Sequence, residues 1–249
     1  MVALSSSNAL VIEQAEDGYK YSMEPFLLAN FVTLSTSCRV LDVGTGCGII
    51  PLLLATRRKT KRIVAIEIQN SLYNIAVKNI LRNGASDSIQ LIHEDFINSK
   101  LGLRGKLFDI VISNPPYRKL NTGRTNPNKE KAIARHELSI DLESLVAKAN
   151  IILKNGGIFT LAYPPKRLKE LLEKLSVHEL FPSKLRFIHG SQGSEASIFL
   201  INAIKKHKTE CVVEPPLYIY NKDGSHSKEI KKIYGSFNYF SRTHHIEKK

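Results

Sequence analysis

Arg39-Val-Leu-Asp-Val-Gly-Thr-Gly-Cys-Gly-Ile-Ile-Pro-Leu-Leu-Leu-Ala55 is the stretch that decides the fold. An apolar run typical of a β-strand ends at Asp42, three alternating glycines follow, and a second apolar run has the pattern of a helix. A strand that turns through glycines into the start of a helix presents backbone N–H groups and lets a ligand approach the main chain closely. The stretch therefore predicts a strand–turn–helix unit that binds a nucleotide-like ligand.

Strands and helices alternate on both sides of this unit. Further strands are predicted over residues 62–68, 89–95, 108–113 and 158–163. Helices are predicted over residues 71–83, 139–153 and 166–175, and Asn155-Gly-Gly157 should stop the second of them. In the lead-in, we expect a short strand over residues 8–14 and a helix over residues 25–34. Alternation at this spacing predicts a parallel, doubly wound α/β sheet.

The end of the chain has a different pattern. Residues 184–189 and 196–204 read as two strands with only a short glycine-containing connection. A helical crossover does not fit there, so the two strands should pair antiparallel as a hairpin. After residue 204 the chain turns polar and basic, with a possible strand at residues 217–220. We expect a lead-in over residues 1–38, a core over residues 39–204 and a basic C-terminal extension over residues 205–249.

The bulk composition points to an anionic partner. The chain has 249 residues, 43% of them hydrophobic, and a formal net charge of +13. Such an excess is typical of nucleic-acid binding, with a membrane surface as the second choice. No apolar stretch is long enough to span a bilayer, and the first residues lack the pattern of a secretory signal. Cys38, Cys47 and Cys211 are far apart, so we expect reduced thiols, no metal site and a cytoplasmic location.

Ligands of open α/β sheets bind beyond the carboxyl ends of the strands, so the residues there are candidate site residues. The glycine turn has the spacing G-x-G-x-G and contains Thr45; its glycines are Gly44, Gly46 and Gly48. Glu67 ends the next strand about 20 residues later, where an acid accepts hydrogen bonds from ribose hydroxyls. The alternative for Glu67 is a solvated carboxylate at the end of a strand.

Asp95-Phe96 follows the third strand. Asp95 is placed to receive the exocyclic amine of an adenine, and Phe96 to stack on its ring. The alternative is a loop acid beside a core phenylalanine. The sequence has no G-x-x-x-x-G-K-[ST] motif, which disfavours a triphosphate site.

Asn114-Pro-Pro-Tyr117 follows the fourth strand and is the sharpest signal. Two consecutive prolines cannot continue a central strand, because neither has an N–H to donate. Pro115 and Pro116 therefore stiffen the exit and fix where the Asn114 amide and the Pro115 carbonyl point. Two acceptors held together can grip the two hydrogens of an –NH2 group, and Tyr117 offers a flat face to a planar substrate.

The order of these motifs resembles class I S-adenosylmethionine-dependent amino-methyltransferases, over roughly residues 20–204. The resemblance implies a Rossmann-like fold with a mostly parallel seven-stranded sheet and a C-terminal antiparallel hairpin. It implies S-adenosylmethionine as cofactor, with the glycine turn at its amino-acid end, Glu67 at its ribose and Asp95 with Phe96 at its adenine. The cofactor-binding set is then Asp42, Gly44, Thr45, Gly46, Gly48, Glu67, Ile68, Asp95, Phe96 and Asn114, and the catalytic set is Asn114, Pro115, Pro116 and Tyr117.

More narrowly, the chain resembles the bacterial tRNA(Val) adenine-N6 methyltransferases, which modify the adenine beside the anticodon. The features are the lead-in 17–29, Asn114-Pro-Pro-Tyr117, Ala134-Arg-His-Glu137, and Pro215-Pro-Leu-Tyr-Ile-Tyr220 with Ile233-Tyr-Gly235. The lead-in commonly has Asp where this chain has Glu24, and it would lie on the cofactor site. Residues 118–135 form a basic segment after Tyr117, which predicts a clamp for the substrate through Arg118, Lys119 and Arg124, with a solvated loop as the alternative. The resemblance implies RNA as partner and adds Arg135 and His136 to this substrate-binding set.

The acceptor stays open at this point. Methyltransferases of rRNA or DNA share the core, and protein-glutamine methyltransferases of release factors use the same Asn-Pro-Pro-Tyr motif. A catalytically dead RNA-binding module is a further alternative, against which the intact Asp42, Glu67 and Asn114 argue. The lysines of the C-terminal extension are interleaved with Tyr218, Tyr220 and Tyr234, which favours an RNA backbone surface as much as a solvated tail. The sequence leaves the oligomeric state open.

Overall fold

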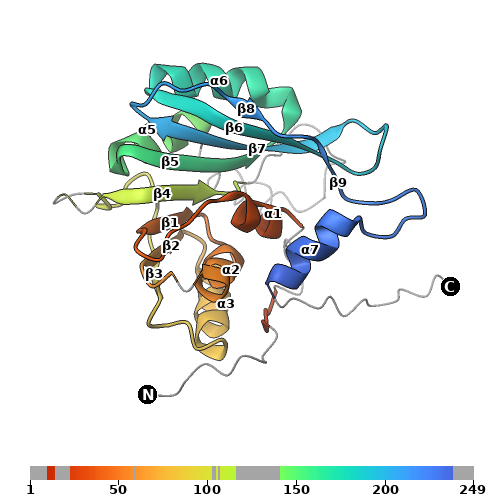
Figure 1. The fold of residues 1–249 in the computed structure, drawn as a ribbon. Helices are drawn as coiled ribbons and strands as arrows, with labels where there is room; N and C mark the ends of the chain where they lie inside the picture. The colour runs from red at the N-terminus through yellow and green to blue at the C-terminus, as the bar shows by residue number, and fades with distance from the viewer. Residues whose placement is uncertain are drawn as a thin grey trace, which may run out of the picture.

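One twisted sheet organises the chain in the computed structural model, which describes residues 10–14, 23–58, 60–102, 105, 107–115 and 141–237 (Figure 1). Five strands run parallel: β1 (Val40–Val43), β2 (Ile63–Glu67), β3 (Ile89–His93), β4 (Phe108–Ser113) and β5 (Leu153–Tyr163). The hairpin of β6 (Leu180–His189) and β7 (Ala196–Lys205) is antiparallel, and β7 pairs antiparallel with β5. The predicted α/β class and terminal hairpin are confirmed.

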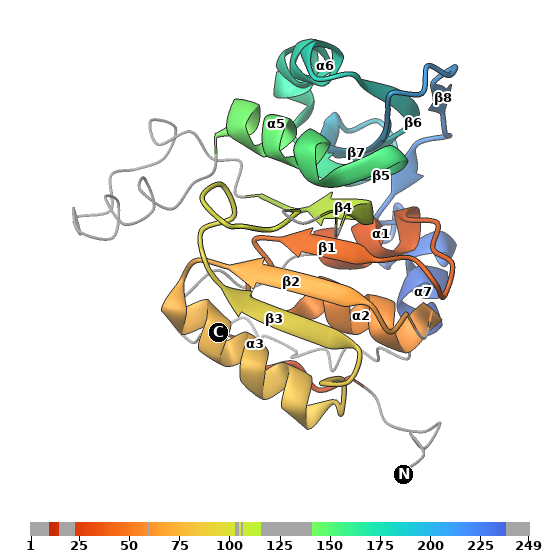
Figure 2. The ribbon, with the colours of Figure 1, turned by 90° about the vertical axis from the view of Figure 1, so that its left-hand side faces the viewer.

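The strand order is β3-β2-β1-β4-β5-β7-β6-β8, and Figure 2 shows β3 to β5 stacked in this sequence. Among the described residues the sheet has nine strands, rather than the seven expected. The two additional strands, β8 (Val212–Val213) and β9 (Leu217–Tyr218), have two residues each and pair parallel with β6. Both belong to the C-terminal extension. The sequence predicted a strand at the position of β9 but none at that of β8, because the extension is mostly polar.

Helices cover both faces of the sheet: α1 (Glu24–Phe31), α2 (Ile49–Arg58), α3 (Asn70–Arg82), α5 (Leu142–Ile152), α6 (Leu168–Val177) after the short η2 (Pro165–Arg167), and α7 (Lys228–Ser236). One buried cluster joins α1, α2 and α7, and a second joins α5 and α6. Successive residues of β1 alternate between them, with Val40 in the first and Leu41 in the second. Because both faces are covered, the central strands are nearly all apolar.

Several boundaries differ from the prediction, most clearly those around α5 and β5. The helix predicted over residues 139–153 begins at Leu142, where the Asp141 side chain accepts the Ser144 backbone N–H at 3.0 Å, and ends at Ile152. Gly156 and Gly157 lie inside β5 and do not stop the helix. The side chain of any residue other than glycine at position 157 would start 2.9 Å from the Lys154 carbonyl oxygen, so the close approach of the backbone requires this glycine.

The lead-in strand predicted over residues 8–14 is wrong for its described part. Residues 10–14 lie in no strand, and the backbone groups of Val11 and Glu13 bond to side chains of α3 and of its C-cap residue instead. Asn79 Oδ1 accepts the Glu13 N–H at 2.8 Å, and Asn83 Oδ1 accepts the Val11 N–H at 3.1 Å. Amide side chains on one helix thus take the place of a partner strand. Within the described part of the chain, every helix falls short of the length and apolar character that crossing a membrane requires.

Candidate active site

The carboxyl ends of β1 and β4 lie side by side at the topological switch point of the sheet, where the strand order changes direction. The chain leaves β1 through α2 toward β2 on one side, whereas β4 pairs with β1 on the other. Val43 and Ser113 are register partners, and Ser113 Oγ donates a hydrogen bond to the Val43 carbonyl at 3.0 Å. The glycine turn after β1 and Asn114 after β4 therefore lie next to each other at one edge of the sheet, the edge at which open α/β sheets bind ligands.

Glu67 holds the glycine turn against the end of β2. Its Oε2 accepts the Gly46 backbone N–H at 2.8 Å and its Oε1 accepts the Gln69 N–H at 2.9 Å. The side chain is buried, so Glu67 is not the solvated strand-end carboxylate of the alternative interpretation. A carboxylate accepts more than one hydrogen bond at each oxygen, so these contacts leave capacity for a ligand hydroxyl.

The backbone N–H groups of Gly44, Thr45, Gly46 and Gly48 are already used within the protein. Those of Gly44 and Thr45 donate to the Ile66 carbonyl at 3.0 and 3.1 Å, and that of Gly48 donates to Thr45 at 3.0 Å. The turn is therefore not the open N–H cradle that a phosphate needs. Added Cβ atoms at Gly44 and Gly46 would meet open space, whereas one at Gly48 would lie 3.3 Å from Ala76 of α3. A ligand can thus approach the first two glycines closely, and the third seats the turn on α3.

Asp42 is fully buried beside this turn. Neither of its carboxylate oxygens, nor Thr45 Oγ1, makes a regular hydrogen bond within the described part of the chain. Burial raises the pKa of Asp42 to about 7; the Thr45 hydroxyl opposes the rise from a position short of hydrogen-bond geometry, and the Glu67 charge adds to it. A buried carboxylate without partners needs an explanation, and a ligand that donates hydrogen bonds supplies one.

Asn114 is held in one orientation by the lead-in. Its Nδ2 donates to Oε2 of Glu24, the first residue of α1, at 3.3 Å. A carboxylate accepts hydrogen bonds and cannot donate them, so the contact requires the –NH2 side of the amide to face Glu24. The amide oxygen of Asn114 therefore points away from Glu24. The half-buried Asn114 thus lies at the end of β4 with the –NH2 side of its amide turned to Glu24.

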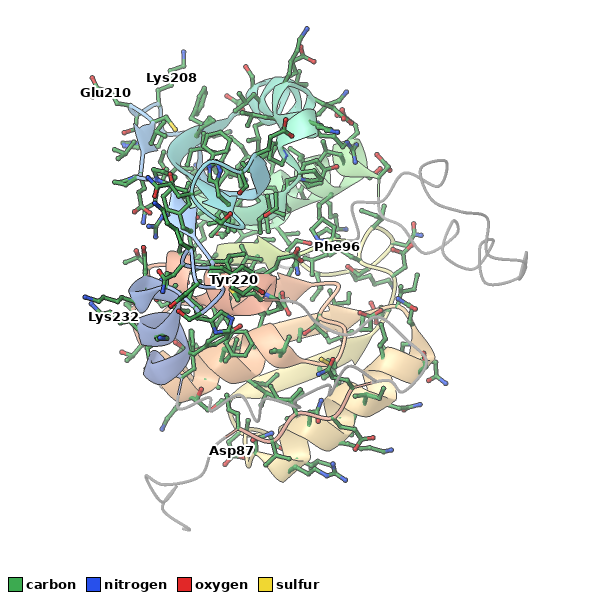
Figure 3. The ribbon with its side chains drawn as sticks, turned by 90° about the vertical axis from the view of Figure 1, so that its right-hand side faces the viewer. Asp87, Phe96, Lys208, Glu210, Tyr220 and Lys232 are labelled. Carbon is green, nitrogen blue, oxygen red and sulfur yellow. The ribbon has the colours of Figure 1, made fainter. Side chains whose placement is uncertain are left out.

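Asp95 and Phe96 match the alternative interpretation, a loop acid beside a core phenylalanine. Asp95 Oδ1 accepts the Ile97 N–H at 2.9 Å and Oδ2 accepts the Asn98 side chain, so the carboxylate stabilises its own turn. The Phe96 side chain is 1% exposed and belongs to the buried cluster under α5 (Figure 3). Its ring has no exposed face to stack on an adenine, because it packs into the hydrophobic core.

Two residues outside the predicted set help to build the site. Glu24 holds Asn114, and Asn79 of α3 is completely buried and donates from Nδ2 to the carbonyls of Cys47 and Glu13, at 2.9 and 3.0 Å. Asn79 therefore ties the glycine turn to the lead-in. Its signal in the sequence is an amide on an otherwise apolar helix face. Ile68 lies at the same edge, and its carbonyl is 3.0 Å from His93 Nε2.

The remaining predicted site residues lie outside the described part of the chain. They are Pro116, Tyr117, Arg118, Lys119, Arg124, Arg135 and His136. Pro115 is described and follows Asn114 directly, half-buried at the end of β4. The described geometry therefore covers the glycine turn and the first two residues of the Asn-Pro-Pro-Tyr motif.

Comparison with known families and proteins places the chain among methyltransferases. The family model of the methyltransferase small domain matches residues 24–179, more than half of the chain. A protein of Dyadobacter fermentans named tRNA1(Val) (adenine(37)-N6)-methyltransferase is 26% identical over 234 residues, covering 91% of this chain and 93% of that protein. A protein of the same name from Porphyromonas gingivalis is 34% identical over 147 residues, covering 58% of this chain and 57% of that protein.

Solved structures show the same fold. The crystal structure of a predicted O-methyltransferase from Agrobacterium tumefaciens superposes with a TM-score of 0.67 at 21% identity, over 88% of this chain and 99% of that one. That of TrmN from Thermus thermophilus gives a TM-score of 0.54 at 19% identity, over 73% of this chain and 48% of that one. At these identities the likeness shows a Rossmann-like class I methyltransferase fold.

Proposed function

The chain belongs to the methyltransferase small domain family, and from this premise we propose that it transfers a methyl group from S-adenosylmethionine to the N6 amine of an adenine in tRNA. The observation that carries the proposal is the Asn114 amide, held by Glu24 with its oxygen directed elsewhere, at the end of β4. The names of the relatives from Dyadobacter fermentans and Porphyromonas gingivalis support adenine 37 of tRNA(Val) as the target. The net charge of +13 suits an RNA backbone.

The hydrogen-bond acceptors beside the glycine turn fit S-adenosylmethionine. Ribose hydroxyls and the ammonium of an amino acid are hydrogen-bond donors, and the edge holds two buried carboxylates, Asp42 and Glu67. The N–H groups of the turn bond within the protein, so the edge suits a donor-rich ligand better than a phosphate. We propose that Glu67 holds the ribose and that the open backbone at Gly44 and Gly46 receives the amino-acid end. When bound, the cofactor supplies a methyl group already activated by its sulfonium charge.

The role of Asn114 and Pro115 is to prepare the amine. The exocyclic amine of adenine is a poor nucleophile because its lone pair is delocalised into the ring. Hydrogen bonds from its two N–H groups to Asn114 Oδ1 and the Pro115 carbonyl favour a pyramidal nitrogen with its lone pair directed away from the ring. Alignment of reacting groups contributes up to about 7–11 kcal/mol in ideal cases, so these residues need to hold the amine rather than remove its proton before attack.

Product identification tests the proposal. Purified protein is incubated with an unmodified tRNA(Val) transcript and S-adenosylmethionine carrying a deuterated methyl group, and the nucleosides are analysed by mass spectrometry. We expect labelled N6-methyladenosine, which disappears when guanine replaces adenine 37. Label in another nucleoside, or only in the glutamine of an added release factor, would refute the proposed acceptor.

A further inference from the structure

The C-terminal extension places a set of aromatic side chains at the same edge of the sheet as Asn114. β6 is antiparallel to β7 and β7 is antiparallel to β5, so β6 runs in the direction of β4 and β5. The last residue of β6, His189, therefore lies at the edge where β4 ends. Tyr218 of β9 is its register partner, and the two rings are 5.5 Å apart.

From there, four rings form what we call the aromatic row: Tyr220, His226, Tyr234 and Phe26. Tyr220 and His226 are stacked, with centroids 5.4 Å apart and an interplanar angle of 20°. The His226 and Tyr234 centroids are 5.6 Å apart, and Tyr234 meets Phe26 edge to face at 4.9 Å. Phe26 lies two residues after Glu24, which holds Asn114. The row thus runs from the surface to the helix that positions the proposed catalytic amide.

The outer end of the row is rigid and exposed. Tyr220 and His226 form an antiparallel bridge, closed by the Asn221 N–H on the Ser225 carbonyl at 2.8 Å. Asp223 accepts the Ser225 N–H at 2.9 Å, and Gly224 adopts the left-handed conformation with φ of 79°. Tyr220 is nevertheless 44% exposed. A large aromatic surface on an ordered turn loses little conformational entropy when a partner covers it, so the turn is built to present this ring.

The charge around the row is positive. Exposed lysines flank it at positions 222, 228, 231 and 232, and Figure 3 shows Tyr220 near α7, which carries Lys232. The acids of the same segment are engaged: Asp223 with Ser225, and Glu229 with the Arg186 guanidinium at 2.7 and 3.0 Å. Flat rings beside exposed positive charge are complementary to single-stranded nucleic acid, whose bases stack on aromatic side chains while its phosphates meet lysines.

We propose that the aromatic row is a docking surface for unpaired nucleotides of the RNA substrate, with Tyr220 stacking on a base close to the adenine that enters the site. This inference rests on the proposed function. An adenine inside a stacked loop must be extruded before its amine reaches Asn114, and a stacking partner for its neighbour holds the loop open. The row therefore contributes to substrate binding, whereas Asn114 contributes to methyl transfer.

Variants of Tyr220 test the surface. Binding of an anticodon stem-loop RNA and the KM and kcat for its methylation are measured for Tyr220→Ala, Tyr220→Leu and Tyr220→Phe. Loss of one base–aromatic stack is expected to raise Kd and KM about 5- to 100-fold in the Ala and Leu variants, with cofactor affinity unchanged. Tyr220→Phe keeps the ring and should stay within about twofold of wild type. In wild-type complexes, 2-aminopurine placed beside the target adenine should be quenched, and the quenching should disappear with Tyr220→Ala.

The outcomes separate this inference from the proposed function. Normal RNA affinity and unchanged 2-aminopurine quenching in Tyr220→Ala, with N6-methyladenosine still formed by the wild type, would overturn the docking surface alone. A loss in Tyr220→Leu that is absent in Tyr220→Ala would also overturn it, because the defect would then be steric. A wild type that forms no N6-methyladenosine would instead overturn the proposed function. Equal binding of an acidic peptide and the RNA would point to a protein partner and contradict the proposal.

Discussion

At the scale of single residues, the site depends on buried and half-buried groups that hold one another in place. Glu67 fixes the glycine turn, Asn79 ties that turn to the lead-in, and Glu24 orients Asn114. Each contact uses a side chain whose charge or amide would be costly to bury without a partner. Asp42 is the exception, because its buried carboxylate makes no regular hydrogen bond among the described residues. Its raised pKa follows from this burial.

The raised pKa of Asp42 should be visible in the pH dependence of the free energy of unfolding. Its pKa in the folded protein is raised from 3.8 to about 7, so the folded state keeps a proton that the unfolded state has released in this window. The free energy of unfolding therefore falls as pH rises through the window. The side chain of Asn is neutral at every pH. The free energy of unfolding of Asp42→Asn, relative to that of wild type, should therefore rise by about 3 kcal/mol from pH 5 to pH 8. Urea unfolding of the ligand-free proteins measures it.

The exposed Asp87 provides the matched control for this experiment (Figure 3). Asp87→Asn should leave the difference from wild type the same at both pH values. If Asp42→Asn behaves in the same way as this control, the carboxylate of Asp42 is not held neutral by burial, and the account of its surroundings is wrong.

Replacement of Glu67 should weaken cofactor binding. The two carboxylate oxygens of Glu67 accept the N–H groups of Gly46 and Gln69. Glu67→Gln keeps only one of these acceptor oxygens and removes the negative charge. Hydrogen bonds to charged groups contribute about 1.5–3 kcal/mol, so we expect roughly 10- to 100-fold weaker S-adenosylmethionine binding by calorimetry. Glu173→Gln on the exposed face of α6 should bind normally. An unchanged affinity in Glu67→Gln would remove Glu67 from the proposed site.

At the scale of elements, α7 is part of the fold rather than a solvated tail. Ile230, Ile233 and Phe237 are buried against α1, and the Ser227 side chain accepts the Ile230 N–H at 3.3 Å to begin the helix. The Arg186–Glu229 pair joins α7 to β6. The lead-in helix that reaches Asn114 is therefore supported from the C-terminal side of the chain.

Truncation of Ile230 measures this support. Ile230 is completely buried, and an Ile→Ala change in a core typically costs about 2–5 kcal/mol. Ile230→Ala should lower the free energy of unfolding by that amount in urea, whereas Lys231→Ala on the exposed side should change it by less than about 0.5 kcal/mol. Equal stability of the two variants would show that α7 is not docked in solution.

The alternating strands and helices could be predicted from the sequence because their apolar periodicity is local. The hairpin could be predicted because residues 190–195 are too few for a crossover. The end of α5 could not, since Gly156 and Gly157 resemble a helix stop but serve the close pairing of β5. The burial of Phe96 and the reach of Glu24 to Asn114 depend on contacts between distant segments, which no local pattern encodes.

At the scale of the whole molecule, the net charge of +13 has a thermodynamic consequence. Lysines and arginines that neutralise phosphates release counterions, so affinity for tRNA should fall steeply with salt. We expect a loss of about a thousandfold in fluorescence anisotropy titrations between about 50 and 200 mM KCl, as for a protein with six or more phosphate contacts. A loss of less than tenfold would argue that the excess charge does not face RNA.

The central claim is that Asn114 holds the adenine amine for methyl transfer. Its most direct test is the single-turnover formation of N6-methyladenosine in tRNA(Val) by Asn114→Ala, with cofactor affinity measured on the same sample. The control is Asn155→Ala, an exposed residue near the start of β5, at the edge of the sheet opposite to Asn114. We predict cofactor affinity within about fivefold of wild type and a rate at least about a thousandfold lower, since both alignment and lone-pair preparation are lost. Methylation by Asn114→Ala at a rate near that of the control would contradict the account.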